Sequence, residues 1–237
     1  MGERALFIEN PKDTTNRYDA AWVKKNEEKR WKHLLPWWDL DKLPYTVLGP
    51  YLSPLVLKSF VEGLHDPQQR PSADDWETAL IKTVDLMQPC QNSSCQQGWY
   101  VFDNSTRPAC PFCGTRFKGQ LPVLNLYSKR GSGSSVKYYP DNHRLMVYHN
   151  QYLYQWHVNS SVFPNEKLTD SQKKPVGYFA FHQNNWCFVN QTLIGMKDMT
   201  ENKDIPPNSM VALTDGKQIL LTSEPGGRLI QIQLVSA

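Results

Sequence analysis

Four of the five cysteines in the 237-residue chain form two closely spaced pairs. The first pair lies in CQNSSC and the second in CPFC: Cys90 with Cys95, and Cys110 with Cys113. Each pair fits a short turn that aims two thiolates at one point, and the sequence between the pairs suits a strand and a turn that bring them together. This is the arrangement of a zinc ribbon with four sulfur ligands. The sequence therefore predicts Zn²⁺ bound by these four cysteines.

Because the protein would supply all four ligands, such a site has no position for a catalytic water, and the predicted role of the metal is structural. It would contribute on the order of 10 kcal/mol to folding. Gly114 allows the backbone to turn so that amides point at sulfur. Two disulfides and a redox-active CxxC pair are the alternatives. The fifth cysteine, Cys187 in NNWCFVN, alternates with large apolar residues and is expected to be a buried thiol.

The composition is that of a folded protein, with 40% hydrophobic and 12% aromatic residues. Its 26 basic and 23 acidic residues are interspersed and leave a net charge of +3, which disfavours a nucleic-acid partner. The chain has no run of 18 apolar residues and no signal-peptide pattern. We therefore expect a cytoplasmic protein with reduced cysteines and no membrane partner.

Residues 1–88 have the apolar spacing of helices. One helix is expected over residues 19–35. A second is expected to begin at Ser53, followed by proline, and to end at Gly63. A third begins at Ser72, where an aspartate three residues later completes a capping box. The third helix is expected to bury Trp76, Leu80, Ile81 and Val84.

Residues 119–237 alternate between apolar and polar residues, as β-strands do. Asp215 and Gly216 predict a tight hairpin between the apolar runs VAL and ILL. At least seven short strands without a convincing helix predict a β-sandwich. The clearest alternating segments are 145–158, 177–190, 209–223 and 228–235.

The stretch LSPLVLKSFVEGLHDPQQRPSADDWETAL resembles the end of a protein kinase C-lobe. The resemblance assigns Arg70 to a buried loop arginine that pairs with a glutamate of the activation segment. The first 88 residues contain no Gly-rich loop, strand lysine, HRD or DFG motif. We therefore expect no enzymatic activity from this chain, and we expect it to be the C-terminal part of a longer serine/threonine kinase.

The combination of ALFIENPKDTTNR, the kinase-like stretch, four cysteines and GGRLIQIQLV is similar to the C-terminal region of bacterial serine/threonine kinases associated with tellurite-resistance gene clusters. Those kinases are encoded beside a von Willebrand factor A (VWA) domain protein and a metal-dependent serine/threonine phosphatase. The resemblance implies a regulatory region that recruits the VWA protein, with the phosphatase as a further partner.

The segment NNWCFVNQTLIGM and the later IPPNSMVALTDGKQILL resemble the second half of a forkhead-associated (FHA) domain. The resemblance places Asn190 at the family's loop-ordering asparagine, and phosphothreonine-peptide binding is an alternative function. That family reads phosphothreonine with an Arg, a Ser and a His on loops. The nearest candidates here stand at different spacings: Arg144, His149 and His157.

A VWA partner would hold a divalent metal with one coordination position open, which a carboxylate of this chain could fill. Four loop acids are candidates: Asp66, Asp103, Asp141 and Asp215. The pair Trp37-Trp38 is a candidate interface anchor, with core packing as its alternative. A ribbon that binds nucleic acid is the remaining alternative, using Arg116, Lys118, Lys129 and Arg130.

Together these patterns predict an α+β multidomain protein. The expected parts are a helical kinase C-lobe remnant over residues 1–88, a four-cysteine zinc ribbon over residues 89–118, and an FHA-like β-sandwich over residues 119–237.

Overall fold

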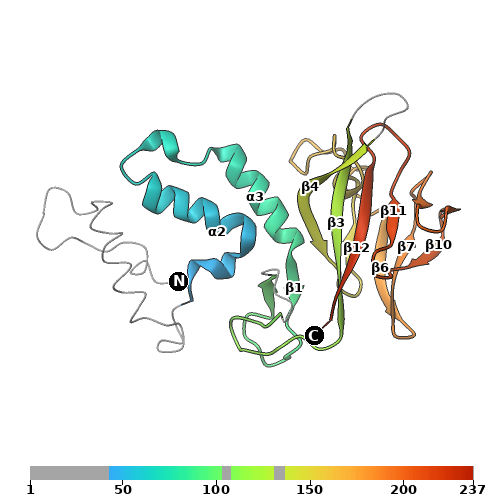
Figure 1. The fold of residues 1–237 in the computed structure, drawn as a ribbon, viewed down its shortest axis with the longest axis horizontal. Helices are drawn as coiled ribbons and strands as arrows, with labels where there is room; N and C mark the ends of the chain where they lie inside the picture. Colours follow the sequence, from blue (N-terminus) through green and yellow to red (C-terminus); the bar gives the residue numbers. More distant parts are fainter. Residues whose placement is uncertain (1–42, 103–107, 131–136, 237) are drawn as a thin grey trace, which may run out of the picture.

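The computed structural model describes residues 43–102, 108–130 and 137–236. The described part is a mixed α+β structure in which two helices and a small ribbon lie beside a larger β-structure (Figure 1). The helix expected over residues 19–35, the Trp37-Trp38 pair and Asp103 lie outside the described residues. None of the described helices combines the length and the apolar character needed to cross a bilayer.

The second expected helix begins earlier than predicted. Pro50 occupies its first turn, whereas Ser53 lies inside it and donates a hydrogen bond from Oγ to the Gly49 carbonyl at 2.6 Å. Pro54 is also internal, and a π-helical turn that ends at Gly63 follows. The segments are η3 (Tyr45–Leu48), α2 (Gly49–Leu57) and η4 (Lys58–Glu62).

After the short helix η5 (Pro67–Gln69), the third expected helix is α3 (Ala73–Asp85). Its capping box is confirmed: Asp75 N donates to Ser72 Oγ at 3.2 Å, and Ser72 N donates to the Asp75 carboxylate at 2.8 Å. The expected buried face is wrong at two of its four positions, because Leu80 is 50% and Val84 62% exposed, whereas Trp76 and Ile81 are partly buried. The helix instead buries Ala79, Thr83 and Asp85.

One residue after α3, the chain enters a two-stranded antiparallel ribbon of β1 (Met87–Pro89) and β2 (Trp99–Val101). The strand expected between the two cysteine pairs is therefore present. Cys90 follows β1 directly, and its amide donates to the Gly98 carbonyl at 2.8 Å. The ribbon thus positions the first cysteine pair immediately beyond the end of α3.

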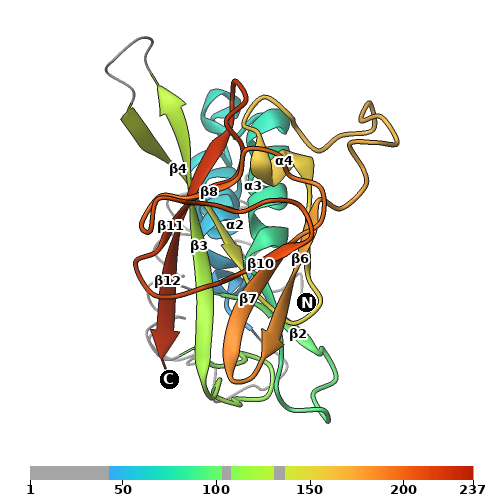
Figure 2. The ribbon, with the colours of Figure 1, turned by 90° about the vertical axis from the view of Figure 1, so that its right-hand side faces the viewer.

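The remaining strands form two further antiparallel sheets, which pack face to face as a sandwich (Figure 2). One sheet has six strands in the order β4-β3-β12-β11-β8-β9, and the other has four in the order β10-β7-β6-β5. The bounds are β3 (Gln120–Arg130), β4 (Lys137–Met146), β5 (Tyr152–Leu153), β6 (Gly177–His182), β7 (Asn185–Asn190), β8 (Lys197–Asp198), β9 (Lys203–Asp204), β10 (Ser209–Ala212), β11 (Gln218–Leu220) and β12 (Arg228–Ser236), with the short helix α4 (Gln155–Val158).

The expected sandwich strands at 177–190 and 228–235 are confirmed as β6, β7 and β12. The segment 145–158 is not one strand, because it contains the end of β4, a loop, β5 and α4. The predicted hairpin at Asp215-Gly216 is wrong. β10 pairs with β7, whereas β11 pairs with β8 and β12, so this turn carries the chain from one sheet to the other.

Two apolar clusters stabilise the described part. The larger cluster fills the sandwich between its sheets and includes the fully buried rings of Phe179 and Phe188. The smaller cluster contains residues from all three expected parts: Leu86, Phe102, Leu121, Val123 and Met146. Helix α3, the ribbon and β3–β4 therefore share one core, whereas the division at residues 88/89 and 118/119 stays a prediction about independent folding.

Candidate functional site

The four predicted ligands lie together. Their sulfur atoms are all within 4.8 Å of one another, with 3.6 Å between Cys90 and Cys113 and 3.8 Å between Cys95 and Cys110. A Zn²⁺ ion with four bonds of about 2.3 Å needs sulfur atoms about 3.8 Å apart, since they stand at the corners of a tetrahedron. A disulfide needs about 2.05 Å, and all four thiols are free. The arrangement fits a metal centre.

The loop chemistry around the sulfurs suits metal binding. Gly114 has φ +71°, as its expected turn requires, and its amide donates to the Cys110 carbonyl at 2.8 Å. Contacts with the Thr115 hydroxyl and amide lower the pKa of Cys113 to about 6, whereas burial raises the pKa of Cys110 to about 12. A cation bound between the four sulfurs would favour the thiolate form of each cysteine.

The two cysteine loops are also tied to each other and to the helix. The Gln91 side chain accepts from the Lys118 amide at 2.7 Å and donates to the Lys118 carbonyl at 3.0 Å. Phe102 N donates to the Leu86 carbonyl at 2.9 Å, next to the end of α3. A metal bound by the four sulfurs would therefore stabilise the junction between α3 and β3.

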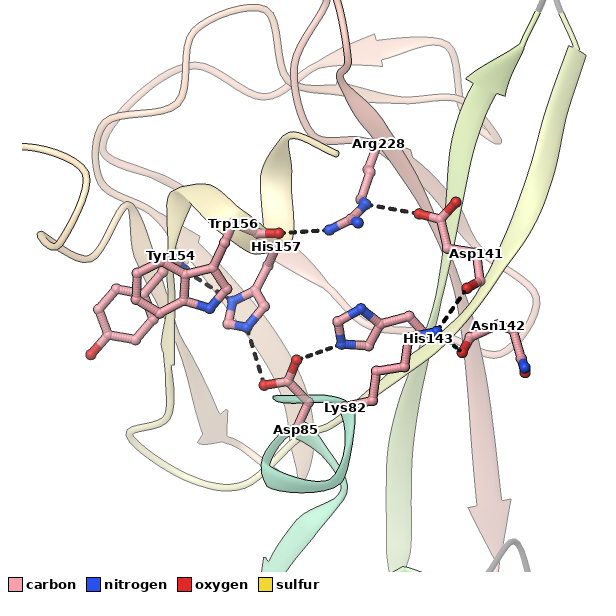
Figure 3. Close-up of polar contacts among 9 residues, drawn as sticks. All are labelled: Lys82, Asp85, Asp141, Asn142, His143, Tyr154, Trp156, His157 and Arg228. Carbon is pink, nitrogen blue, oxygen red and sulfur yellow. Dashed lines mark hydrogen bonds and ion pairs between the residues drawn. The ribbon is translucent and has the colours of Figure 1, made fainter. Parts of the chain in front are cut away.

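A second polar cluster lies where α3 meets the sandwich (Figure 3). Asp85, the last residue of α3, is bonded to His143 Nε2 of β4 at 2.5 Å and to His157 Nε2 of α4 at 3.2 Å. Because His157 Nδ1 accepts from the Tyr154 amide at 3.1 Å, its proton lies on Nε2 and is donated to Asp85. The side chains of Asp85, His143 and His157 are all buried, so the cluster fixes the helix against the sandwich.

A cleft of about 470 Å³ adjoins this cluster. His143 forms part of its wall, together with Lys82 of α3, Asp141 of β4 and Arg228 of β12. Arg228 Nε donates to the Asp141 carboxylate at 2.8 Å, and its Nη1 donates to the Trp156 carbonyl at 2.6 Å. The ion pair is largely buried, with 12% and 14% of the two side chains exposed. The cleft therefore combines buried charges with access to solvent.

Two further residue predictions from the sandwich are matched by its geometry. Cys187 is 5% exposed on β7, and burial raises the pKa of its thiol. Asn190 at the end of β7 is fully buried, and its side chain bonds the Leu193 amide and the carbonyls of Leu193 and Ile205. Asn190 thus orders the following loop.

Arg70 differs from its expectation, because it is exposed rather than buried. Its guanidinium donates to the carbonyls of Gly63 and Leu64 at 2.7 and 2.9 Å, at the end of the preceding helix. These carbonyls accept no hydrogen bond within the helix, so the guanidinium from the next loop supplies their hydrogen-bond donors. The arginine stabilises a local turn.

The three described candidate acids have different surroundings. Both oxygens of Asp66 accept hydrogen bonds, from Gln68 N and from Gln69 Nε2. Asp141 is not an exposed loop acid, since it lies on β4 and pairs with Arg228. Asp215 is exposed: its Oδ1 accepts from Leu234 N at 2.8 Å, while its Oδ2 has no hydrogen-bond partner among the described residues.

The basic residues proposed for nucleic acid do not gather at the ribbon. Arg116 and Lys118 precede β3, whereas Lys129 and Arg130 lie at its far end, about 30 Å away at about 3.3 Å per residue.

The candidate residues for phosphothreonine binding also differ in role. His157 is buried against Asp85, and His149 Nδ1 accepts from the Phe181 amide at 3.1 Å.

Asp85, His143, Lys82 and Arg228 were not identified as a site from the sequence. Asp85 is 58 residues from His143 and 72 from His157, so no local spacing connects them. The period of two in β4 contains one usable signal. It places His143 on the same face as the buried Leu145, where an isolated imidazole needs a polar partner.

The fold and the site together define a mixed α+β protein with an antiparallel β-sandwich and a candidate four-thiolate metal centre. Comparisons with known protein families, with curated proteins and with solved structures found no significant match. The kinase and FHA resemblances therefore depend on the sequence motifs quoted above.

Proposed function

We propose that this chain is a non-catalytic docking region of a bacterial serine/threonine kinase, stabilised by structural Zn²⁺, which recruits a VWA-domain protein in a tellurite-resistance phosphorylation system. The cytoplasm is the proposed compartment, since it keeps thiols reduced. The four sulfurs support a metal whose coordination sphere is complete, because a tetrahedral ion has no position left for a water or substrate.

Asp215 carries the docking proposal. It lies in the turn from β10 to β11, where the Leu234 amide holds Oδ1 and the exposed Oδ2 stays available. A hard divalent cation prefers carboxylate oxygen, and a carboxylate already oriented by the backbone loses less entropy on binding. Asp215 would complete the open coordination position of the partner's metal.

Co-purification with the neighbouring VWA protein tests this proposal, with Asp215→Asn as the informative variant. The asparagine keeps an oxygen for the Leu234 amide but replaces the free oxygen by an NH₂ group, which does not bind the metal. We expect at least a tenfold loss of affinity, whereas Asp204→Asn, at an exposed acid of β9, should bind as the unchanged protein does.

The variant avoids an ambiguity of chelation, since EDTA would also remove metal from the cysteine centre. No complex with the unchanged chain would exclude the VWA partner. A complex that tolerates Asp215→Asn would exclude Asp215 as the metal-binding contact and leave recruitment through another surface.

A further inference from the structure

The cleft beside Asp85 is built from several separate elements, which makes it a feature of the assembled fold. Helix α3 contributes Ile81 and Lys82, and β4 contributes His143. The segment after α4 contributes Phe163, and β12 contributes Arg228. Its volume of about 470 Å³ lies in the range of small-molecule sites.

Hydrogen-bond donors converge on the cleft from two cations. Lys82 Nζ donates to the carbonyls of Asp141 and Asn142 at 3.3 and 3.0 Å, and it lies 5.6 Å from the centre of the Tyr51 ring. The Arg228 guanidinium has five N–H donors, of which one bonds the Asp141 carboxylate and one bonds the Trp156 carbonyl. Burial lowers the pKa of both cations, so a second negative charge in the cleft would stabilise them.

His143 adds a third group with a defined orientation. The residue is 7% exposed, and Asp85 holds its Nε2. Its Nδ1 makes no hydrogen bond within the described part of the chain, and in Figure 3 this atom points away from Asp85 toward the side of Arg228. Solvent reaches Nδ1, and a hydrogen-bond donor of a ligand in the cleft would give it a partner.

Part of the lining is apolar. Phe163 is 42% exposed although it lines the cleft, and Ile81 and Val162 lie in the same lining. An exposed ring beside a group of cationic donors is suited to a ligand with a flat apolar part and an anionic end.

We propose that this cleft binds a small phosphate monoester carried on a ring. Lys82 and Arg228 would donate to the phosphate oxygens, His143 Nδ1 would accept from a phosphate hydroxyl, and Phe163 would pack against the ring. Charge-assisted donors from different elements match the several acceptor oxygens of a phosphate. A metal cation is disfavoured, because Lys82 and Arg228 would repel it. The site is separate from Asp215 and from the cysteine centre, so it does not depend on the proposed docking function.

Calorimetric titration of the full chain with phenyl phosphate tests the proposal. We expect sub-millimolar binding, with inorganic phosphate and phenol each at least tenfold weaker, because each lacks one half of the ligand. Two further probes also combine a phosphate monoester with a ring. Tighter binding of a nucleoside monophosphate would support a free metabolite as the ligand, and tighter binding of a phosphotyrosine peptide would support a modified side chain.

Two variants test the assigned contacts. Lys82→Gln removes a charge but keeps donors for the two carbonyls, and it should weaken phenyl phosphate binding at least tenfold, whereas Lys203→Gln on the exposed strand β9 should not. Phe163→Ala should weaken phenyl phosphate and leave inorganic phosphate unchanged. Thermal unfolding verifies that each variant is folded. Absence of phenyl phosphate binding, or equal affinity in folded Lys82→Gln, would overturn the proposal.

Discussion

Asp85 places a carboxylate in the interior, where α3 ends against the sandwich. Burial alone would raise the pKa of this carboxyl, but electrostatic attraction to His157 and hydrogen bonds from the His143 and His157 imidazoles lower it to about 2. The cysteine ligands were predictable because their spacing is local. Asp85 and its two histidines were not, because only the folded chain brings them together.

The lowered pKa of Asp85 predicts a pH-dependent contribution to stability. With a pKa of about 2 in the folded state and about 3.9 in the unfolded chain, the carboxylate stabilises the fold fully above about pH 4, and this contribution is lost as the pH falls toward 2. We expect Asp85→Asn to lower the free energy of unfolding by about 2–3 kcal/mol at pH 7, from urea titration. The difference from the unchanged protein should shrink at pH 2.5, and a constant difference would contradict this explanation. Asp204→Asn serves as the exposed control.

At the scale of elements, strands were predictable where alternation reflects burial against a core. Phe179 of β6 and Ile230 and Ile232 of β12 are buried between the sheets, as the period of two predicts, although Phe181 of β6 is 46% exposed. In 145–158 the aromatic residues instead pack on one another. The Tyr154 and Trp156 rings stack with centroids 4.4 Å apart, and Tyr148 packs edge-on against Trp99 of the ribbon. Their apparent alternation therefore did not mark a strand.

Helix α3 shows the corresponding limit for helical periodicity. Its length and capping box were predictable because both depend on neighbouring residues. The orientation of its faces was not predictable, since Leu80 and Val84 are exposed while Thr83 and Asp85 are buried. The polar cluster with His143, formed by a distant strand, decides which side of the helix is buried.

The cysteine ribbon is an element whose folding should depend on metal. We expect about one Zn²⁺ per chain by metal analysis, and Cys110→Ser should lower zinc affinity at least tenfold, because a neutral hydroxyl replaces a buried thiolate. Limited proteolysis should then cut within residues 90–118. Cys187→Ala, at the buried thiol outside the cluster, is the matched control and should keep its zinc. Full zinc content in Cys110→Ser would contradict the proposed ligand set.

At the scale of the whole molecule, the small core couples segments that the sequence divides into three. Leu86 is fully buried between α3 and the ribbon, and it packs with Leu121 and Val123 of β3 and Met146 of β4. The Asp85 cluster joins the same helix to β4 and α4. Because helix, ribbon and sandwich share these contacts, we expect the described part to unfold cooperatively rather than as three independent parts.

Leu86→Ala tests this cooperativity far from the mutated residue. The truncation removes a fully buried side chain and should cost about 2–5 kcal/mol. If the parts unfold together, hydrogen exchange should accelerate in the ribbon and also in β7, which lies in the opposite sheet and shares no cluster with Leu86. Ile194→Ala, at a side chain 78% exposed, should leave exchange unchanged. Faster exchange confined to α3 and the ribbon would show instead that the sandwich folds by itself, as the division at residue 118/119 predicts.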